Sequence, residues 1–223
     1  MLTLHHLENS RSQRILWLLE ELGVNYQIER YERDPGSGLA PASLLKIHPL
    51  GKSPVITDGD ITVAESGAIV EYLVERYDDG SLAPSDDAAE RRSYSYWLHY
   101  AEGSFMPLMI VSLIMSRIEA APLPFFAKPI ARGIVNKVRE SYLDPNVRRH
   151  LDYLNDQLAD KEWFLGNRLS AADIQMSFAI EAAEVRSDLP ERYPNLNGYL
   201  ARMRARPAYQ AALQRGGPYS LGA

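Results

Sequence analysis

The chain has 223 residues, of which 46% are hydrophobic and 24% are charged, a composition typical of a globular protein. The 24 Lys and Arg residues are outnumbered by 29 Asp and Glu residues, and the net charge of −5 argues against a nucleic-acid-binding protein. There is no cysteine, which excludes disulfides, thiolate nucleophiles and zinc-ribbon sites. The N-terminus lacks the features of a signal peptide, and the longest strongly apolar stretch, residues 107–115, is shorter than a membrane span. We therefore expect a cytoplasmic protein that binds neither nucleic acid nor membrane.

Alternating and helical periodicities near the N-terminus predict a βαβ unit. Residues 2–6 alternate as one face of a short strand, and residues 12–22 carry apolar side chains at the i, i+3, i+4, i+7 spacing of a helix. Gly23 suits the left-handed position that ends such a helix. Residues 24–29 alternate again and predict a second, half-buried strand.

A hairpin and a further helix are expected to complete this unit. The runs 54–57 and 61–64 are rich in β-forming residues and flank Asp58-Gly59-Asp60, where glycine accepts the positive φ of a tight turn. A short helix is expected at residues 43–47, before the hairpin, and a longer one after it. The order β-α-β-α-β-β-α predicts an α/β domain over residues 1–78, with helices on the faces of a small mixed sheet.

The remainder of the chain is predicted to be helical. Residues 79–87 are polar and contain Gly and Pro, which is typical of a linker. A long helix is expected from Ala88 to about Ser116, with Pro107 kinking or offsetting it. Apolar spacing predicts further helices around residues 130–138, 147–158, 171–185, 193–206 and 208–213, with Asp144-Pro145 between the first two. We therefore expect an all-α domain over residues 88–223.

Common catalytic and metal-binding motifs are absent from the sequence. There is no Gly-x-Gly-x-x-Gly after a strand, no phosphate-binding loop and no Gly-x-Ser-x-Gly motif. The five histidines include no i, i+4 pair, and His5 and His6 would point to opposite faces of a strand. We therefore expect no bound metal. The sequence also argues against the common types of dehydrogenase, nucleotide hydrolase and serine hydrolase.

Polar side chains gather just before the first predicted helix, in Asn9-Ser10-Arg11-Ser12. Such residues commonly cap the free amides at a helix N-terminus. The alternative is that one hydroxyl, helped by the positive end of the helix, donates a hydrogen bond to a bound thiolate.

Two further clusters suit a ligand with the groups of an amino acid or peptide. Pro54 is an ordinary way to open a strand, but a cis Ser53–Pro54 bond would leave the Ser53 backbone free to pair with a peptide-like ligand. Ser66 at the start of a helix is ordinarily a cap, yet the amides beside it also suit a carboxylate, while Glu65 suits an ammonium group. An α-amino acid carries both of these charges on one carbon.

Taken in order, these clusters resemble the cytosolic glutathione transferase family, and in particular the fungal and bacterial branch that includes yeast glutathione transferase one. The resemblance covers essentially the whole chain. The motifs that carry it are Ser10–Arg14, Leu44–Pro54, Ala64–Ile69, Tyr100–Ser104 and Leu169–Ile174.

The resemblance implies a thioredoxin-like N-terminal domain, a helical C-terminal domain and, usually, a homodimer. The family's cis-proline falls on Pro54. Its backbone contact with the cysteinyl part of glutathione falls on Ser53.

The other glutathione contacts that the resemblance implies involve the two ends of the tripeptide. The pair that anchors the γ-glutamyl group falls on Glu65 and Ser66. Lys52 matches the position that approaches the glycyl carboxylate, and His48 is expected to help.

The resemblance also implies which group activates the thiol. In serine-type members the activating hydroxyl lies four residues before a basic residue of the first helix, and counting back from Arg14 gives Ser10. Ser12 is the near competitor and Asn9, also expected to bind glutathione, is a third candidate. The first loop holds no tyrosine and the chain no cysteine, so tyrosine-type and cysteine-type activation are not expected.

Two features of the helical half are expected to be structural in whole or in part. Ser170-x-x-Asp173 fits a reciprocal capping box before an apolar helix. Aromatic and Met side chains on the long helix mostly suit the core or a dimer contact, with a minority facing an apolar electrophile pocket. The candidates for that pocket are Tyr100, Phe105, Met106 and Met109.

The combined prediction is a transferase that takes glutathione as co-substrate and lowers the pKa of its thiol, so that the thiolate attacks a hydrophobic electrophile. A glutathione-dependent disulfide or peroxide reductase is an alternative, and its product would be oxidised glutathione instead of a thioether. A non-catalytic binding or regulatory protein with the same fold is the third alternative.

Overall fold

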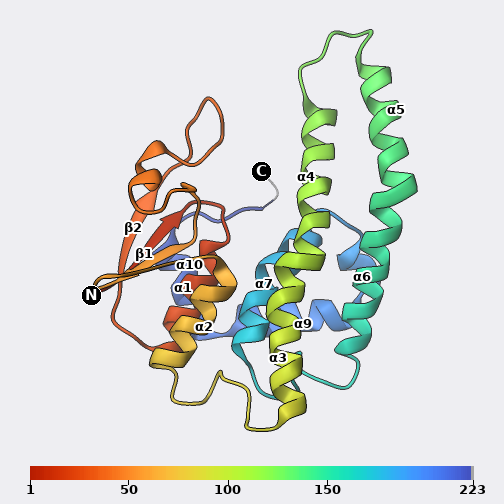
Figure 1. Ribbon diagram of the computed structural model, residues 1–223. Coiled ribbons are helices and arrows are strands. Elements are labelled where there is room, and N and C mark those ends of the chain that lie inside the picture. Colours follow the sequence, from red (N-terminus) through yellow and green to blue (C-terminus); the bar gives the residue numbers. More distant parts are fainter. Residues whose placement is uncertain (222–223) are drawn as a thin grey trace.

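The computed structural model describes residues 1–221, which form an α/β half and a helical half packed against each other (Figure 1). The predicted fold class is confirmed, because a four-stranded mixed sheet with helices is followed by a bundle of helices. Residues 222–223, the last two of the predicted helical domain, lie outside the described range.

The sheet contains β1 (Leu2–Leu7), β2 (Gln27–Tyr31), β3 (Val55–Asp58) and β4 (Ile61–Ala64), in the spatial order β2-β1-β3-β4. β1 is parallel to β2 and antiparallel to β3, and β3 is antiparallel to β4. The hairpin from β3 to β4 turns at Gly59, whose φ of 60° agrees with the predicted turn. β2 begins later than the alternation suggests, because Val24 and Tyr26 pack against the core from the connection that precedes it.

Helix α1 (Ser12–Leu22) is enclosed on nearly every side. It lies against the sheet and α2 (Ser66–Tyr77), while α7 (Ala171–Glu184) and α10 (Pro207–Gly216) of the helical half pack on it as well (Figure 1). No side chain from Ile15 to Leu19 is exposed. Gly23, with φ 62°, ends the helix as predicted. The short helix expected near residues 43–47 is a single 3₁₀ turn, η1 (Ala42–Lys46).

The first long helical run contains a wide turn ahead of its proline. α3 (Ala88–Tyr100) continues through the π-helical turn η2 (Ala101–Phe105) into α4 (Met106–Ala120). There the amide of Met106 donates to the carbonyl of Ala101, five residues back, which accommodates Pro107 without ending the helix. The expected offset near Pro107 is confirmed.

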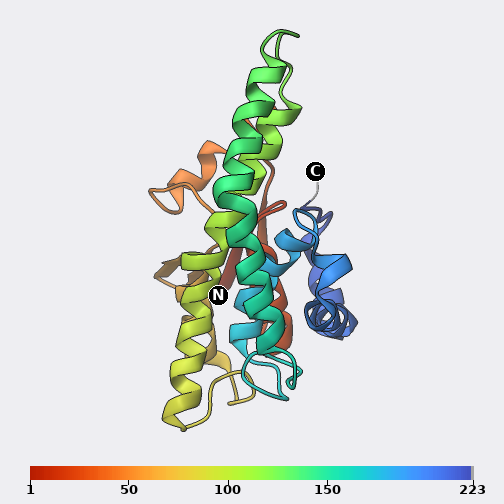
Figure 2. The same ribbon diagram turned by 90° about the vertical axis from the view of Figure 1, so that its right-hand side faces the viewer.

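The second long run uses the same arrangement, and the predicted break at Asp144-Pro145 is wrong. α5 (Lys128–Val138) continues through η3 (Arg139–Leu143) into α6 (Asp144–Gln157). The amide of Asp144 donates to the carbonyl of Arg139, so Pro145 again follows a five-residue turn. The ends of α4 and α5 project together as a hairpin beyond the rest of the molecule (Figure 2).

The continuous helix Ala88–Ala120 is longer than the sequence suggested, and by length and composition it is apolar enough to cross a membrane. In its most apolar window, 44% is buried inside the protein. Core helices of water-soluble proteins pass the same test, so this helix does not by itself identify a membrane segment.

α7 lies between the two halves and begins with the predicted capping box. The amide and hydroxyl of Ser170 donate to Oδ2 of Asp173 at 2.9 and 2.7 Å, and the amide of Phe164 donates to Oδ1 at 2.7 Å. Burial raises the pKa of Asp173 to about 6, against the lowering effect of these hydrogen bonds. α8 (Leu189–Arg192), which the sequence did not predict, and α9 (Pro194–Ala205) complete the bundle with α10.

Candidate functional site

A polar cavity of about 180 Å³ lies where loops of the α/β half meet the helical half. Six of the residues that the resemblance assigned to glutathione line this cavity, whereas Asn9 and the two candidate activating serines, Ser10 and Ser12, do not. The full lining is Arg11, His48, Leu50, Lys52, Ser53, Pro54, Ala64, Glu65, Ser66 and Glu102.

Ser53 ties the loop before β3 to the end of β1. Its hydroxyl donates to the carbonyl of His5 at 2.9 Å and accepts from the amide of Leu7 at 3.2 Å. The Ser53–Pro54 peptide bond is cis, as the resemblance implies. Because the Ser53 hydroxyl is occupied by β1, its backbone is the part that remains for a ligand.

Glu65 and Ser66 form the start of α2. Glu65 has φ 70°, and a positive φ costs a non-glycine residue on the order of 1 kcal/mol, so the surrounding structure must hold it there. Ser66 is buried, and its Oγ accepts a hydrogen bond from Nε2 of Gln175 in α7 at 3.3 Å. In the described part of the chain neither Glu65 nor Ser66 caps α2 through its side chain, so the capping interpretation of Ser66 is wrong. The amides of the first turn remain available to an anion.

A chain of contacts joins the two halves across the cavity. Nε of Arg11, immediately before α1, lies 2.8 Å from Oε2 of Glu102 in η2. Arg14 of α1 donates to the other carboxylate oxygen of Glu102 and to the carbonyl of Gln175. Since Gln175 also reaches Ser66, the start of α2 and the turn η2 are connected through a single set of polar groups.

Glu102 is held as a carboxylate in the cavity wall. Burial alone would raise its pKa, but the charges of Arg14 and Arg11 outweigh burial and keep the pKa below its ordinary value. Burial lowers the pKa of Arg14, and Glu102 opposes that effect. The two guanidinium groups also lie over the Phe178 ring, 5.9 Å (Arg11) and 5.3 Å (Arg14) from its centre. Arg11 and Glu102 therefore hold opposite charges at fixed positions in the cavity wall, with the buried guanidinium of Arg14 behind them.

Sequence analysis did not assign this cluster to the site. Arg11 and Glu102 are 91 positions apart, and no local pattern relates residues at that separation. The two arginines did fall inside the Ser10–Arg14 motif of the resemblance and Glu102 inside Tyr100–Ser104, but nothing in either motif relates one to the other.

Ser10 and Ser12 belong to a buried chain of hydrogen bonds at the start of α1. The two hydroxyls are 2.8 Å apart, and Ser12 Oγ lies 2.8 Å from Nδ1 of His6 and 3.2 Å from the carbonyl of Leu7. Ser10 Oγ also accepts from the amide of Ser12 at 3.2 Å, which satisfies one free amide of the helix start. Burial lowers the pKa of His6 to about 4, so its ring is neutral at pH 7. Ser12 is 0% exposed and Ser10 is 7% exposed, so Ser10 is the more accessible hydroxyl.

Asn9 is held differently from the two serines. It is half-buried and has φ 47°, in the left-handed region that asparagine tolerates better than most residues. Its Oδ1 accepts from the backbone amide of Ser220 at 2.7 Å, and its carbonyl accepts from Arg33 at 3.2 Å. The C-terminal segment is therefore in contact with the loop that follows β1.

The four residues predicted for the electrophile pocket are buried in the core of the helical half. None of them lines the polar cavity, and the hydroxyl of Tyr100 forms a hydrogen bond with Nδ1 of His150. Their exposed fractions are 7% for Tyr100, 0% for Phe105, 4% for Met106 and 1% for Met109.

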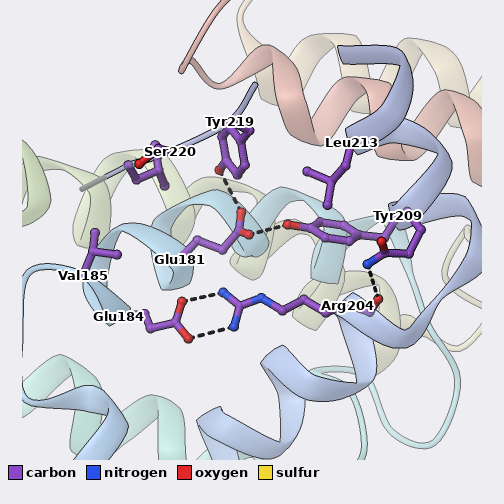
Figure 3. Close-up of a pocket in the computed structure, with 10 residues that line it drawn as sticks. Glu181, Glu184, Val185, Arg204, Tyr209, Leu213, Tyr219 and Ser220 are labelled. Carbon is purple, nitrogen blue, oxygen red and sulfur yellow. Dashed lines mark hydrogen bonds and ion pairs between the residues drawn. The ribbon is translucent and has the colours of Figure 1, made fainter. Parts of the chain in front are cut away.

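A larger hollow, of about 380 Å³, lies between α7, α9, α10 and the C-terminal segment (Figure 3). Glu181 of α7 lies in its wall, with the hydroxyls of Tyr209 and Tyr219 both directed at its carboxylate (Figure 3). None of the predicted site residues lines it. Within residues 1–221 no cluster of three or more His, Asp or Glu side chains is arranged to hold a metal ion.

Comparison with protein-family models gives two matches in chain order. The model for the glutathione S-transferase N-terminal domain matches residues 1–75, and the model for the C-terminal domain of the same family matches residues 113–207. The resemblance seen in the sequence is thereby confirmed.

Similar proteins of both kinds, curated sequences and solved structures, agree with this result. Glutathione S-transferase 3 of Schizosaccharomyces pombe is 39% identical over 216 residues, covering 96% of this chain and 88% of that protein. Glutathione S-transferase 1 of Saccharomyces cerevisiae is 32% identical over 223 residues, covering 96% of this chain and 95% of that protein. A crystal structure of a glutathione S-transferase from Actinobacillus pleuropneumoniae superimposes with a TM-score of 0.79 at 32% identity, covering 97% of this chain and 93% of that one.

Proposed function

Because the chain belongs to the glutathione S-transferase family and is a glutathione transferase, we propose that the polar cavity binds glutathione and that the loop Asn9–Ser12 activates its thiol. The observation that carries this proposal is the chemistry of the cavity lining. One small hollow holds a carboxylate from Glu65, a helix start at Ser66 and a cation from Lys52. Glutathione presents one ammonium group, two carboxylates and two peptide bonds, which is the complementary set.

The two ends of glutathione are assigned by charge. The ammonium of the γ-glutamyl group pairs with Glu65, while its carboxylate accepts from Ser66 and the first amides of α2. The glycyl carboxylate lies toward Lys52, with His48 beside it. Between them, the cysteinyl part pairs with the backbone of Ser53, whose side chain is already bonded to β1.

Ser10 is proposed as the hydroxyl that stabilises the thiolate. It is the more exposed of the two serines, whereas Ser12 serves hydrogen bonds inside the protein. The proton of Ser10 is free to point at the sulfur when Ser12 accepts from Nδ1 of His6 and donates its single proton to Ser10 instead of to the carbonyl of Leu7. A free thiol has a pKa of about 8.5, and lowering it by about two units corresponds to about 2.7 kcal/mol of preference for the thiolate.

The proposed reaction is conjugation of the thiolate to an electrophilic carbon. The thiol proton goes to solvent, and a sulfur lone pair then forms the new carbon–sulfur bond. The electrons of the broken bond leave with the leaving group, or move along an activated double bond that afterwards takes a proton from water. Tyr100, Phe105, Met106 and Met109 are proposed to support the wall of the electrophile site from behind, since all four are buried.

We also propose a cytoplasmic homodimer. Several large apolar side chains are exposed on the hairpin of α4 and α5, and exposed apolar surface of this extent is commonly covered by a partner. They are Ile110 (41%), Ile114 (47%), Ile118 (38%), Ile130 (65%) and Ile134 (61%). Sedimentation equilibrium of the purified chain tests this part, and a mass of one chain at micromolar concentration would contradict it.

Calorimetric titration with reduced glutathione tests the proposed site. We expect binding to the unmodified chain and at least about tenfold weaker binding to Glu65→Ala/Ser66→Ala, because a charged pair and a hydrogen bond are both lost. Glu75→Ala, on the exposed face of the same helix, is the matched control. Equal affinity in the double variant and the control would contradict the assignment. Product analysis separates conjugation, which gives a thioether, from reduction, which gives oxidised glutathione.

A further inference from the structure

A third hollow, of about 220 Å³, lies between α4, η3, the start of α6 and the turn that follows α7. It shares no lining residue with the polar cavity or with the hollow of Figure 3. Three arginines from separate parts of the chain line it, so the fold brings three cationic side chains to one space. The full lining is Ser112, Arg139, Leu143, Asp144, Val147, Arg148, Arg186, Ser187 and Asp188.

Arg186 is a half-buried cation without an anion. Its Nη2 donates to the carbonyl of Leu221 at 2.8 Å, and among residues 1–221 its guanidinium group forms no ion pair. Burial lowers the pKa of Arg186, Tyr219 opposes this effect, and the positive charge of Arg117 lowers the pKa further. Removing a charge from water without a partner costs free energy, so this position favours a bound anion.

The other two arginines are also loosely paired. Nη2 of Arg139 donates to Oγ of Ser116 at 3.2 Å and lies 3.6 Å from Oε2 of Glu119, which is beyond hydrogen-bond distance. Arg148 is exposed and forms no ion pair within the part of the chain that the structure describes. Both guanidinium groups therefore keep donors for a ligand.

The hollow also contains two carboxylates, which oppose the binding of an anion. Oδ2 of Asp188 accepts from Arg192 at 3.1 Å, so its charge is paired with a residue outside the lining. Asp144 is the first residue of α6, one turn before Arg148, and it lines a neighbouring surface depression as well. Within residues 1–221 the lining thus has three cations and one carboxylate without an ion pair, which is an excess of positive charge.

Ser112 places a buried hydroxyl in the same hollow. The residue is 2% exposed, yet among the described residues its hydroxyl has no hydrogen-bond partner. A helical serine commonly donates to the carbonyl one turn earlier, as Ser116 does to Ser112 at 3.1 Å. Because Ser112 does not do so, its proton is available to an acceptor in the hollow.

We propose that this hollow binds a phosphate group, either as free phosphate or as a small phosphate monoester. Guanidinium groups match the oxygens of phosphate in geometry and charge, and a serine hydroxyl adds one more donor. Leu143 and Val147 supply apolar surface, which suits the organic part of a monoester. The site needs neither glutathione nor the polar cavity, so the proposal is independent of the proposed function.

Calorimetric titration with inorganic phosphate, and separately with glycerol 3-phosphate, tests the site at low ionic strength. We expect a Kd of about 1 mM or below for at least one of the two ligands, and the comparison distinguishes free phosphate from a monoester. Arg186→Gln is expected to weaken binding at least about tenfold, and the exposed Arg148→Gln about threefold. Arg92→Gln, at an exposed position of α3, is the control with the same change of charge.

Two further variants separate this hollow from other places where phosphate could bind. Asp144→Asn is expected to tighten binding about threefold, because it removes a negative charge from the lining. Ser66→Ala, in the polar cavity, is expected to leave the affinity for phosphate unchanged.

Several results would overturn the proposal. One is the absence of binding for both ligands, and another is equal affinity in Arg186→Gln and Arg92→Gln. A larger loss of affinity in Ser66→Ala than in Arg186→Gln would place the phosphate in the polar cavity instead. Circular dichroism shows whether Arg186→Gln folds, and if it does not, unchanged affinity in both Arg148→Gln and Asp144→Asn is the contrary result.

Discussion

Arg11 and Glu102 are 91 positions apart in the sequence, yet their side chains pair at 2.8 Å in the wall of the polar cavity. The same carboxylate also accepts from Arg14, which is completely buried in α1. Glu102 sits on the π-helical turn that precedes Pro107, so the geometry of that turn decides where the carboxylate is held. The helical half thus supplies an anion to a site otherwise built from loops of the α/β half.

Glu102→Gln is expected to destabilise the protein, because it leaves the buried Arg14 guanidinium without an anion. Removing one partner of a well-buried pair costs about 3–5 kcal/mol, and the partial exposure of Glu102 reduces the expected loss to about 2 kcal/mol. Urea denaturation measures the change in the free energy of unfolding. Asp86→Asn, which breaks the exposed pair with Arg91, is the control and should leave the free energy of unfolding nearly unchanged. Equal effects of the two substitutions would contradict a structural role for Glu102.

Asp173→Ala is expected to impair folding before it affects catalysis. The substitution removes the capping box and leaves the amides of Phe164 and Ser170 without their acceptor. A loss of about 2 kcal/mol would lower the melting temperature by about 4–8 °C in a chain of this length. Calorimetry measures the melting temperature, and Asp160→Ala, at an exposed position, is the control. An unchanged melting temperature in Asp173→Ala would refute the assignment.

Asp173 and His6 are expected to influence stability in opposite directions over the same range of pH. The pKa of Asp173 is raised to about 6 in the folded chain, so the folded state binds the extra proton and stability falls as the pH rises from about 4 to 6. The pKa of His6 is lowered to about 4, so the unfolded state binds the extra proton and stability rises from about pH 4 to 6.5. Each contribution is on the order of 3 kcal/mol, and the two largely offset each other.

A variant that lacks one of the two groups should therefore show the pH dependence of stability that the other group causes. In Asp173→Asn, the free energy of unfolding is expected to rise between pH 4 and 6 more steeply than in the unmodified chain. In His6→Asn, it is expected to fall over the same range. Urea denaturation at several pH values measures both slopes. Parallel pH profiles for all three proteins would show that neither group titrates differently on folding.

Substitution of the two serines at the start of α1 is expected to have different effects, on activity for Ser10 and on stability for Ser12. Ser10→Ala should lower kcat/KM by about 10- to 100-fold, with little change in glutathione affinity, because it removes a donor to the thiolate. Ser12→Ala should lower the free energy of unfolding by about 1–2 kcal/mol, since His6 and the carbonyl of Leu7 lose a buried partner. Steady-state kinetics and urea denaturation of both variants make the comparison. Normal turnover in Ser10→Ala would shift the activating role to another group of the loop.

Local patterns in the sequence were sufficient to predict most of the elements. The end of α1 at Gly23, the turn at Gly59 and the capping box at Ser170 each follow from a few neighbouring residues, and the structure has all three. The prolines were harder to interpret. Pro145 predicted a break, but the helix continues because the π-helical turn η3 precedes the proline. No simple sequence pattern marks such a turn.

The candidate site was predictable only where the resemblance supplied it. Ser53, Glu65 and Ser66 follow from motifs, and the structure brings them into one cavity. The ion pair of Arg11 with Glu102 and the contact of Ser220 with Asn9 depend on how the two halves pack. Neither contact leaves a local signal in the sequence, because the partners are 91 and 211 positions apart.

The burial of α1 between the two halves also determines how the protein unfolds. Trp17 on this helix is completely buried and packs edge-on against Tyr209 of α10, with ring centres 5.5 Å apart. A fragment that ends at the linker would expose this indole and its neighbours to water, so the α/β half has no finished core of its own. The boundary between the halves is thus not a boundary between folding units, and heating should unfold the described chain in one cooperative step.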